Sequence, residues 1–284
     1  MPDILINGCT IHYNDIGSGV PVVVTPGGRW AGYVQRVIAA ELAKTCRVIT
    51  WDRRNTDGQA DIVIAGEQSE AEIWADDLAT LISALKLGCC YVGEYAGCRV
   101  TPLLCLKHPE LVKGLMLAWP SGGEYAAERL PKSFYRQYIR AALRQGMAGV
   151  VEVDRFAGSI KHRSENRLRL LDMQPYAFVR QMAFWESFFL PSGDLPIAGC
   201  TASIDEFASI KSPAIVIGGN DSIHPTEVAK SLHAIMPDCR YHDPVMTREE
   251  WTKIFNVIPF PQVSDLQGQR IGPLWREFIR RLER

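Results

Sequence analysis

The stretch Gly93–Gly97 places one large side chain, Tyr95, between two glycines, after an apolar run and before a run of helical periodicity. Small residues on both sides of Tyr95 permit a sharp strand-to-helix turn that leaves this side chain exposed. A tyrosine in such a position can donate a proton, orient a carbonyl group, or act as a base where a cation lowers its pKa. We therefore expect Tyr95 to be a catalytic residue.

A carboxylate and an imidazole lie three residues apart, at Asp221 and His224, directly after the apolar run 213–219. A carboxylate close to an imidazole can orient the ring and assist proton transfer. We expect this pair to shuttle a proton, although His224 can also be a loop histidine that packs against Pro225. His242 falls inside the last predicted strand, and we expect it to be structural.

Two glycines, Gly27 and Gly28, follow the β-branched run 21–25. Glycines just past a strand leave backbone N–H groups able to point at an anion, because no Cβ blocks the approach. The alternative is that Gly27 and Gly28 belong to an ordinary loop with no role in binding. The neighbouring Arg29 can clamp a substrate carboxylate with two hydrogen bonds, or it can be a solvated loop charge. We assign Gly27, Arg29 and Trp30 to substrate binding.

Three further side chains are candidates for the same site. Glu94 precedes Tyr95 and is either a proton-transfer and substrate-binding group or a surface carboxylate. Cys98 begins the next helix, where the helix dipole can lower a thiol pKa, but its position predicts burial. Trp185 belongs to an aromatic stripe at helical spacing in 176–189, a pattern more typical of core. We include Trp185 because a helical segment over a sheet edge must face the site below it.

Strands and helices alternate along the chain, and this order predicts an α/β fold with a mainly parallel sheet and right-handed crossovers. A hairpin is predicted within 3–16, and Ser69 and Glu72 form a capping box that opens a helix ending near Gly88. Pro273 is expected to open the terminal helix. The buried strands are predicted at 21–25, 46–51, 89–93, 114–119, 213–219 and 240–245.

The alternation breaks between residues 121 and 205, which hold basic and aromatic helical stretches. This interruption predicts a helical cap, 121–205, inserted into a core domain formed by 1–120 and 206–284. A single core with an insertion is common for α/β proteins of 284 residues.

Composition excludes several classes of function. The 31 basic and 32 acidic side chains are interspersed and give a net charge of -1, so we expect no nucleic-acid partner. No apolar run reaches about 18 residues, and the N-terminus does not resemble a signal peptide, so we expect no membrane partner and a cytoplasmic location. The 8 cysteines include no Cys-x-x-Cys spacing, and we expect neither a metal nor a cofactor. A homodimer is left open.

Five features in this order together resemble the α/β-hydrolase superfamily: the Gly27–Gly28 turn, the loop Asp52-Arg53-Arg54-Asn55-Thr56, the segment 93–97, the segment His108-Pro109-Glu110-Leu111-Val112, and Asp221. The resemblance implies a nucleophile at Tyr95, an acid at Asp221, and an oxyanion hole formed by the N–H groups of Gly28 and Ala96. The family's nucleophile is normally Ser, Cys or Asp. The family's histidine should follow the last strand, but no histidine occurs after His242.

The resemblance, with two of the three triad positions altered, implies an atypical α/β-hydrolase-fold enzyme. We expect it to act on a small, largely apolar substrate that contains a carbonyl group. Ester or lactone hydrolysis through activated water and a lyase, isomerase or cyclisation step both remain open. The alternative is a catalytically inactive pseudo-hydrolase that binds a ligand or acts as a receptor.

Overall fold

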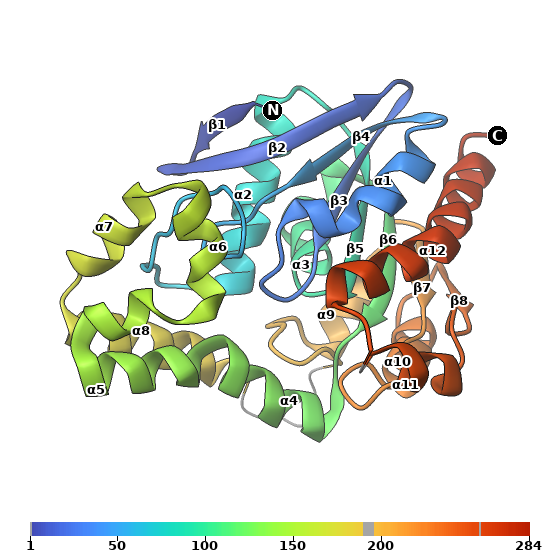
Figure 1. Cartoon of the computed structure of the whole chain (residues 1–284). Helices are drawn as coiled ribbons and strands as arrows, with labels where there is room; N and C mark the ends of the chain where they lie inside the picture. Colours follow the sequence, from blue (N-terminus) through green and yellow to red (C-terminus); the bar gives the residue numbers. More distant parts are fainter. Residues whose placement is uncertain (1, 190–195, 256) are drawn as a thin grey trace.

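The computed structural model describes residues 2–189, 196–255 and 257–284, and these residues form an α/β fold around one sheet (Figure 1). The sheet has 8 strands in the order β1-β2-β4-β3-β5-β6-β7-β8. The β1–β2 and β2–β4 pairs are antiparallel, and all the remaining pairs are parallel. The predicted α/β architecture is confirmed. The strands are β1 (Asp3–Ile6), β2 (Cys9–Gly17), β3 (Val20–Pro26), β4 (Cys46–Trp51), β5 (Cys90–Gly97), β6 (Val112–Pro120), β7 (Ala214–Ile217) and β8 (Cys239–His242).

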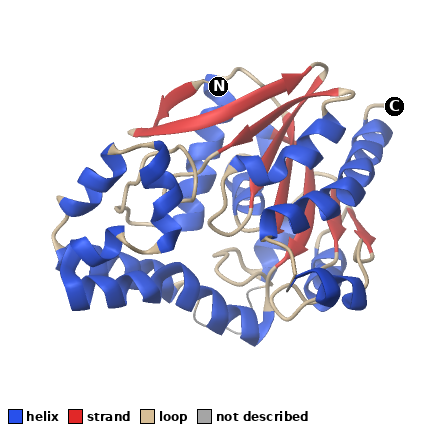
Figure 2. Ribbon diagram, viewed as in Figure 1, coloured by secondary structure: helices blue, strands red, loops and turns tan. Residues whose placement is uncertain are grey.

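Helices cover both faces of the sheet (Figure 2). On one face, α1 (Arg36–Leu42) and α12 (Phe260–Leu282) pack against β3, β5 and β6. On the other face, α2 (Glu70–Ala84), α3 (Val100–Lys107), α9 (Ile204–Ser209) and α10 (Thr226–Ile235) bury a second apolar cluster. The β-branched and aromatic strands are therefore buried on both sides, as expected for a parallel sheet.

The capping box predicted at Ser69 is present. The Ser69 hydroxyl accepts the backbone N–H of Glu72 at 3.2 Å, and the Glu72 carboxylate accepts the backbone N–H of Ser69 at 3.0 Å. These two bonds satisfy donors that the first helical turn leaves without partners, so α2 begins at Glu70.

The expected start of the terminal helix at Pro273 is wrong, because α12 already begins at Phe260 and continues through Pro273. The helix tolerates Pro273 because the residues on either side of this proline pack closely against other elements of the fold. A Cβ at Gly272 would lie 2.7 Å from Cβ of Glu41 in α1, and a Cβ at Gly93 in β5 would lie 2.6 Å from the Trp275 ring. Tertiary packing thus offsets the missing backbone hydrogen bond.

The segment between β6 and α9 contains helices and lies to one side of the sheet (Figure 1). Many of its apolar side chains, among them Phe156, Phe178 and Trp185, form their own buried cluster, which Ile62 and Ile73 of the core also join. Residues 190–195 of the predicted cap lie outside the described residues. The described helices of the segment are α4 (Gly123–Pro131), a π-helix (Lys132–Arg136), α5 (Gln137–Val151), α6 (Asp154–His162), α7 (Glu165–Leu171) and α8 (Pro175–Ser187).

Three further helical elements complete the described chain: a 3₁₀ helix at Gly32–Gln35, a second at Pro109–Leu111, and α11 (Arg248–Phe255). Within residues 2–189, 196–255 and 257–284, no helix combines the length and the apolar character needed to cross a bilayer.

Candidate active site

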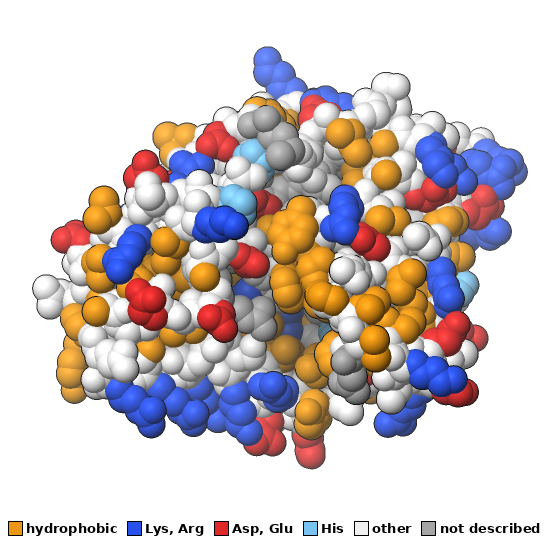
Figure 3. All heavy atoms as spheres, viewed as in Figure 1, with side chains coloured by type: hydrophobic (Ala, Val, Ile, Leu, Met, Phe, Trp, Pro, Cys, Tyr) orange, Lys and Arg blue, Asp and Glu red, His pale blue; other side chains and the backbone are white. Residues whose placement is uncertain are grey.

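A cavity of about 300 Å³ opens where the carboxyl ends of the parallel strands meet the inserted segment. Figure 3 shows hydrophobic side chains gathered around a hollow near the middle of this face. In parallel α/β sheets, ligands bind at this edge. Its walls come from the ends of β3, β5 and β7, from α4 and the π-helix, and from α11 and α12: Gly27, Gly28, Arg29, Trp30, Val34, Tyr95, Ala96, Arg129, Leu130, Ser133, Phe134, Asp221, Ile223, His224, Trp251, Phe255 and Phe260.

The structure brings Asp221 and His224 together on the wall of this cavity. Nδ1 of His224 lies 3.1 Å from each carboxylate oxygen of Asp221. Oδ1 of Asp221 also accepts the backbone N–H groups of Ile223 and His224, both at 2.8 Å. The carboxylate therefore fixes both the loop and the ring. With Nδ1 held by Asp221, Nε2 is the ring nitrogen that can exchange a proton with a substrate or water.

The Asp221 carboxylate is held in its ionised form. Burial raises its pKa, but hydrogen bonding to His224, the charge of His224 and the two backbone N–H groups act in the opposite direction and outweigh burial. The pKa of Asp221 consequently lies below its ordinary value of 3.8. An ionised carboxylate can stabilise the imidazolium that forms when His224 accepts a proton.

One indole ring packs beside the imidazole, and a second indole packs against the first. The Trp119 ring lies with its centroid 5.6 Å from that of His224, and Trp251 lies 4.6 Å from Trp119. Trp251 belongs to α11, which follows the last strand, where the resemblance led us to expect a histidine. An aromatic side chain therefore lines the cavity in that region.

Tyr95 differs from the expectation of an exposed side chain, because only 1% of its surface is accessible. Its ring belongs to the apolar cluster between the sheet and α12, and its hydroxyl donates a hydrogen bond to Oε1 of Gln267 on α12. Burial raises the pKa of the Tyr95 phenol well above its ordinary value of 10.0. The phenol is thus held in the core, although Tyr95 also forms part of the cavity wall.

The sharp turn also lies further along the chain than predicted. Strand β5 continues past Tyr95, which pairs with Ala118, and ends at Gly97. The left-handed backbone falls at Gly97 and Cys98, with φ of 109° and 61°. Tyr95 is therefore a strand residue, and it does not stand at the apex of a turn.

Comparison with solved structures finds the same architecture in several enzymes. The chain is similar to a thermophilic esterase from Thermogutta terrifontis, with 20% identity, 99% of each chain covered and a TM-score of 0.64. It is also similar to a protein from Sphaerobacter thermophilus described as an alpha/beta hydrolase, with 19% identity, 98% and 100% of the two chains covered and a TM-score of 0.61. The chain has the α/β-hydrolase fold. A third similar structure is an enol-lactonase from Burkholderia xenovorans, with 16% identity, 94% and 99% covered and a TM-score of 0.59. Neither a protein-family model nor a curated protein sequence matches the chain.

In this α/β-hydrolase fold, the two expected oxyanion donors lie on adjacent segments. Gly28, with φ of 55°, and Ala96 both line the cavity. The backbone N–H of Gly27 donates to the Tyr95 carbonyl at 2.7 Å, and a Cβ at Gly27 would lie only 1.4 Å from the Ala96 oxygen. Only glycine allows this approach, which keeps the N–H groups of Gly28 and Ala96 on neighbouring segments.

Arg29 reaches the cavity wall, but its guanidinium is bound within the protein. Its terminal nitrogens donate to the two Glu70 oxygens at 3.0 and 2.6 Å, and one of them also donates to the Asn55 carbonyl at 2.9 Å. Both side chains of the ion pair are 1% exposed. Breaking this pair for a substrate carboxylate would leave Glu70 charged and buried, so the predicted clamp by Arg29 does not fit the geometry.

Glu94 caps a helix and lies outside the cavity wall. Its carboxylate accepts the backbone N–H groups of Arg99, Val100 and Thr101 at 2.9, 2.8 and 2.9 Å. These are the donors that the first turn of α3 leaves unpaired, and a negative charge is stabilised there. Glu94 therefore fixes the orientation of α3 relative to β5.

Of the remaining residues that the sequence singled out, Trp30 lies on the cavity wall and the others do not. Trp30 lines the cavity and stacks on Phe260 with ring centroids 4.8 Å apart. Trp185 lies outside the cavity wall, in the core of the inserted segment, where its indole N–H donates to the Gln68 carbonyl at 3.1 Å. Cys98 is fully buried, and burial raises the pKa of its thiol. The imidazole of His242 lies 2.6 Å from the Asp243 carbonyl oxygen, also outside the cavity wall.

Several residues of the cavity wall were not predicted from the sequence, among them Arg129, Phe134, Trp251 and Phe255. The basic and aromatic character of 129–136 was a signal for the first two. No sequence signal placed α11 beside the strand ends, because that contact depends on how the chain turns after β8.

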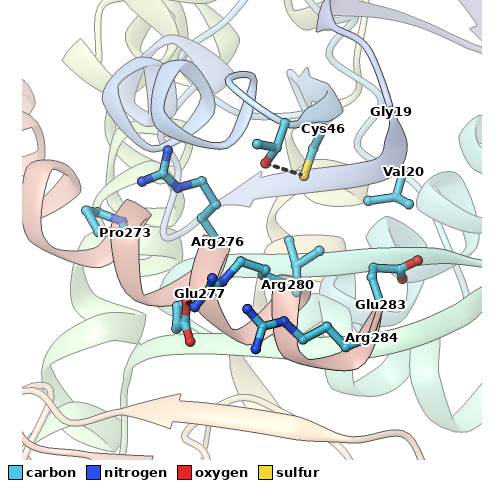
Figure 4. A pocket seen from close by; sticks show the side chains of 11 residues that line it. Gly19, Val20, Cys46, Pro273, Arg276, Glu277, Arg280, Glu283 and Arg284 are labelled. Carbon is cyan, nitrogen blue, oxygen red and sulfur yellow. Dashed lines mark hydrogen bonds and ion pairs between the residues drawn. The ribbon is translucent and has the colours of Figure 1, made fainter.

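A larger groove of about 660 Å³ lies at the opposite edge of the sheet (Figure 4). It runs beside the last turns of α12 and the starts of β3 and β4. Its acidic side chains are paired, Glu277 with Arg280 at 2.6 Å and Glu283 with Lys113 at 2.6 Å. The groove lies at the amino ends of the parallel strands and contains neither Asp221 nor His224.

Proposed function

We propose that the chain is a hydrolase of small, largely apolar esters or lactones, in which His224 and Asp221 activate water. The observation that carries this proposal is the Asp221–His224 pair on the wall of the 300 Å³ cavity, at the carboxyl edge of the sheet. The apolar side chains Trp30, Leu130, Phe134 and Phe260 suit a substrate with a hydrophobic body.

The proposed reaction needs no covalent intermediate. Nε2 of His224 accepts a proton from water as the water oxygen bonds to the substrate carbonyl carbon, and Asp221 stabilises the imidazolium. The N–H groups of Gly28 and Ala96 hold the oxyanion of the tetrahedral intermediate. The carbon–oxygen bond to the leaving group then breaks, and His224 returns the proton to the departing oxygen.

Tyr95 has a structural part in this proposal. Its phenol is bonded to Gln267 in the core, so a serine-like attack from this position has no support in the geometry. The Tyr95 carbonyl accepts hydrogen bonds from the Gly27 N–H at 2.7 Å and from Nε2 of Gln35 at 2.5 Å. These contacts tie the Gly27–Gly28 turn to β5 beneath the reacting carbonyl.

The structural comparisons support the class of reaction. The esterase and the enol-lactonase with the same fold are both named for cleavage of an ester-type bond. We further propose that the inserted segment 121–205 acts as a cap, because its residues Arg129, Leu130, Ser133 and Phe134 form part of the cavity wall.

The test compares two histidine variants in the hydrolysis of p-nitrophenyl butyrate and a short-chain lactone. His224→Gln should lower kcat by about 10²–10⁴-fold, the usual contribution of a general base. His242→Gln, with its imidazole outside the cavity wall, should retain the wild-type rate. Equal rates for wild type and His224→Gln would overturn the proposal.

A second candidate function is ligand binding without turnover, and the burial of Tyr95 at the family's nucleophile position favours it. Binding of butyrate with no hydrolysis of any tested ester or lactone would support this candidate. A proton-transfer reaction at carbon, such as a lyase or isomerase step, would use the same Asp221–His224 pair and would appear as solvent deuterium exchange into the ligand.

A further inference from the structure

One cationic side chain on the cavity wall, Arg129 of α4, has neither a hydrogen bond nor an ion pair with the residues that the structure describes. The other charged groups of the wall are paired, Arg29 with Glu70 and Asp221 with His224. The rest of the lining is mainly apolar. Arg129 therefore offers a guanidinium to whatever occupies the cavity.

A second positive charge lies behind the Gly27–Gly28 turn. Arg53 is 1% exposed, and its Nη2 donates to the carbonyls of Gly27 and Gly28 at 3.2 and 2.9 Å. Its guanidinium also lies 4.3 Å from the Trp74 ring centroid. Burial lowers the pKa of Arg53 to about 10, which still leaves it protonated at neutral pH.

The buried carboxylates around Arg53 are bound to other groups. Glu70 is paired with Arg29, and Glu94 caps α3 beside Arg99, which donates to the Ala198 carbonyl and the Ser121 hydroxyl. Asp52, next to Arg53 in the sequence, is also buried, but its carboxylate accepts the backbone N–H groups of Gly32 and Gln59 at 2.6 and 2.8 Å. The positive charge of Arg53 lies directly behind the turn that lines the cavity, where it favours an anion.

The approach to the cavity is also cationic. Figure 3 shows a row of Lys and Arg side chains along the edge where α4 and α5 lie in Figure 1. Residues 123–151 contain five basic and two acidic side chains, a net charge of +3, although the whole chain has a net charge of -1. A concentration of one sign of charge beside a cleft raises the association rate of ligands with the opposite sign.

We propose that the cavity selects substrates that carry a carboxylate, with Arg129 binding the carboxylate and the apolar walls binding the body of the molecule. This proposal rests on the proposed function for the identity of the reaction, but the charge preference applies equally to a ligand that is bound and not turned over. The substrate class is then a carboxylate-bearing ester or lactone.

The negative charge of Asp221 does not reverse this preference. Its Oδ1 already accepts two backbone N–H groups, and both of its oxygens face Nδ1 of His224. A substrate cation would have to compete with these bonds. Arg129 has no such internal partner among the described residues and is exposed, so it can bind an anion without losing an existing bond.

The first experiment measures binding by calorimetry, with phenylacetate and its neutral analogue phenylacetamide as probes. Wild type should bind phenylacetate about tenfold more tightly than phenylacetamide, a modest value because the contact is solvent-exposed. Arg129→Gln should remove this preference. The control variant Arg180→Gln, an exposed arginine on α8 outside the cavity wall, should keep it.

The second experiment measures kcat/KM for the ionised monoester monoethyl succinate and for neutral ethyl butyrate at low and high salt. Salt should lower the value for the monoester alone, and Arg129→Gln should raise the KM of the monoester alone. Equal binding of phenylacetate and phenylacetamide by wild type would overturn the charge preference. Absence of turnover with the binding preference intact would overturn only the proposed hydrolysis.

Discussion

The Tyr95 hydroxyl and the Gln267 side-chain amide are hydrogen-bonded inside the core, between β5 and α12. This bond joins the strand that the resemblance led us to expect to carry a nucleophile to the helix that covers the sheet. The phenol is consequently part of the packing between sheet and helix. In the proposed function, the acid–base chemistry is assigned instead to His224 and Asp221, which are hydrogen-bonded on the loop after β7.

Replacing Tyr95 by Phe should affect stability more than catalysis. The variant keeps the ring but leaves Oε1 of the buried Gln267 without its donor, at a cost of about 1–3 kcal/mol in the free energy of unfolding. Urea denaturation measures this loss, and Tyr176→Phe, exposed on α8, should show none. A tenfold or larger fall in kcat for Tyr95→Phe, equal to about 1.4 kcal/mol in the activation barrier, would instead return Tyr95 to the catalytic machinery.

The stabilising effect of Asp221 should depend on pH. Its folded-state pKa lies below the ordinary value of 3.8, so its contribution is fully present above that value and is lost as the pH falls through the lower folded-state pKa. Asp221→Asn should therefore lower the free energy of unfolding by about 1–3 kcal/mol at pH 7. This difference between variant and wild type should shrink below about pH 4. Urea denaturation at pH 7 and below about pH 4 measures this difference, with a variant of the exposed Asp172, Asp172→Asn, as the control. A difference that stays constant with pH would contradict the assignment.

Removing the charge of Glu70 should be far more damaging than removing a surface charge. Glu70→Gln leaves the buried Arg29 guanidinium without its counter-ion, and the free energy of unfolding should fall by about 3–5 kcal/mol. Arg47→Gln breaks an exposed pair with Asp15, and it should cost less than about 1 kcal/mol. Equal losses in the two variants, measured by guanidinium denaturation, would show that Arg29 is not held as an ionised, buried group.

Glu94→Gln should loosen the start of α3. The variant keeps one acceptor oxygen but turns an amide toward backbone donors and removes the negative charge at the helix N-terminus, with an expected loss of about 2–3 kcal/mol in the free energy of unfolding. Hydrogen exchange should accelerate at the amides of Val100 and Thr101, which now donate to the Glu94 carboxylate. The exposed Glu110→Gln serves as the control. Unchanged exchange at these amides would rule out the capping role.

Local sequence patterns predicted much of the fold because they report local physics. The β-branched run before Gly27 corresponds to β3, and the Ser69–Glu72 pattern corresponds to α2. Pro273 misled the prediction because a proline is locally unfavourable in a helix, whereas the packing of Gly272 and Trp275 that holds α12 together comes from distant elements.

Less of the candidate active site could be predicted from the sequence, because many of its contacts depend on tertiary packing. Asp221 and His224 are three residues apart, so their proximity could be expected from the chain itself. The ion pair of Arg29 with Glu70 and the hydrogen bond of Tyr95 with Gln267 join residues 41 and 172 positions apart. The donors that Glu94 caps are only 5 to 7 positions away, but the cap depends on where β5 ends and α3 begins. Arg29, Glu94 and Tyr95 were therefore expected to face a substrate, whereas in the structure their side-chain polar groups bind other parts of the protein.

The Tyr95–Gln267 bond also has a consequence for protein synthesis, because its two residues are 172 positions apart. At about 5–20 residues per second, a ribosome needs roughly 10–35 s after making Tyr95 to make Gln267. Until then the face of β5 that α12 covers has no helix to bury it. The nascent chain consequently carries an uncovered apolar sheet face during this interval, which makes it a candidate client for the chaperones that bind growing polypeptides.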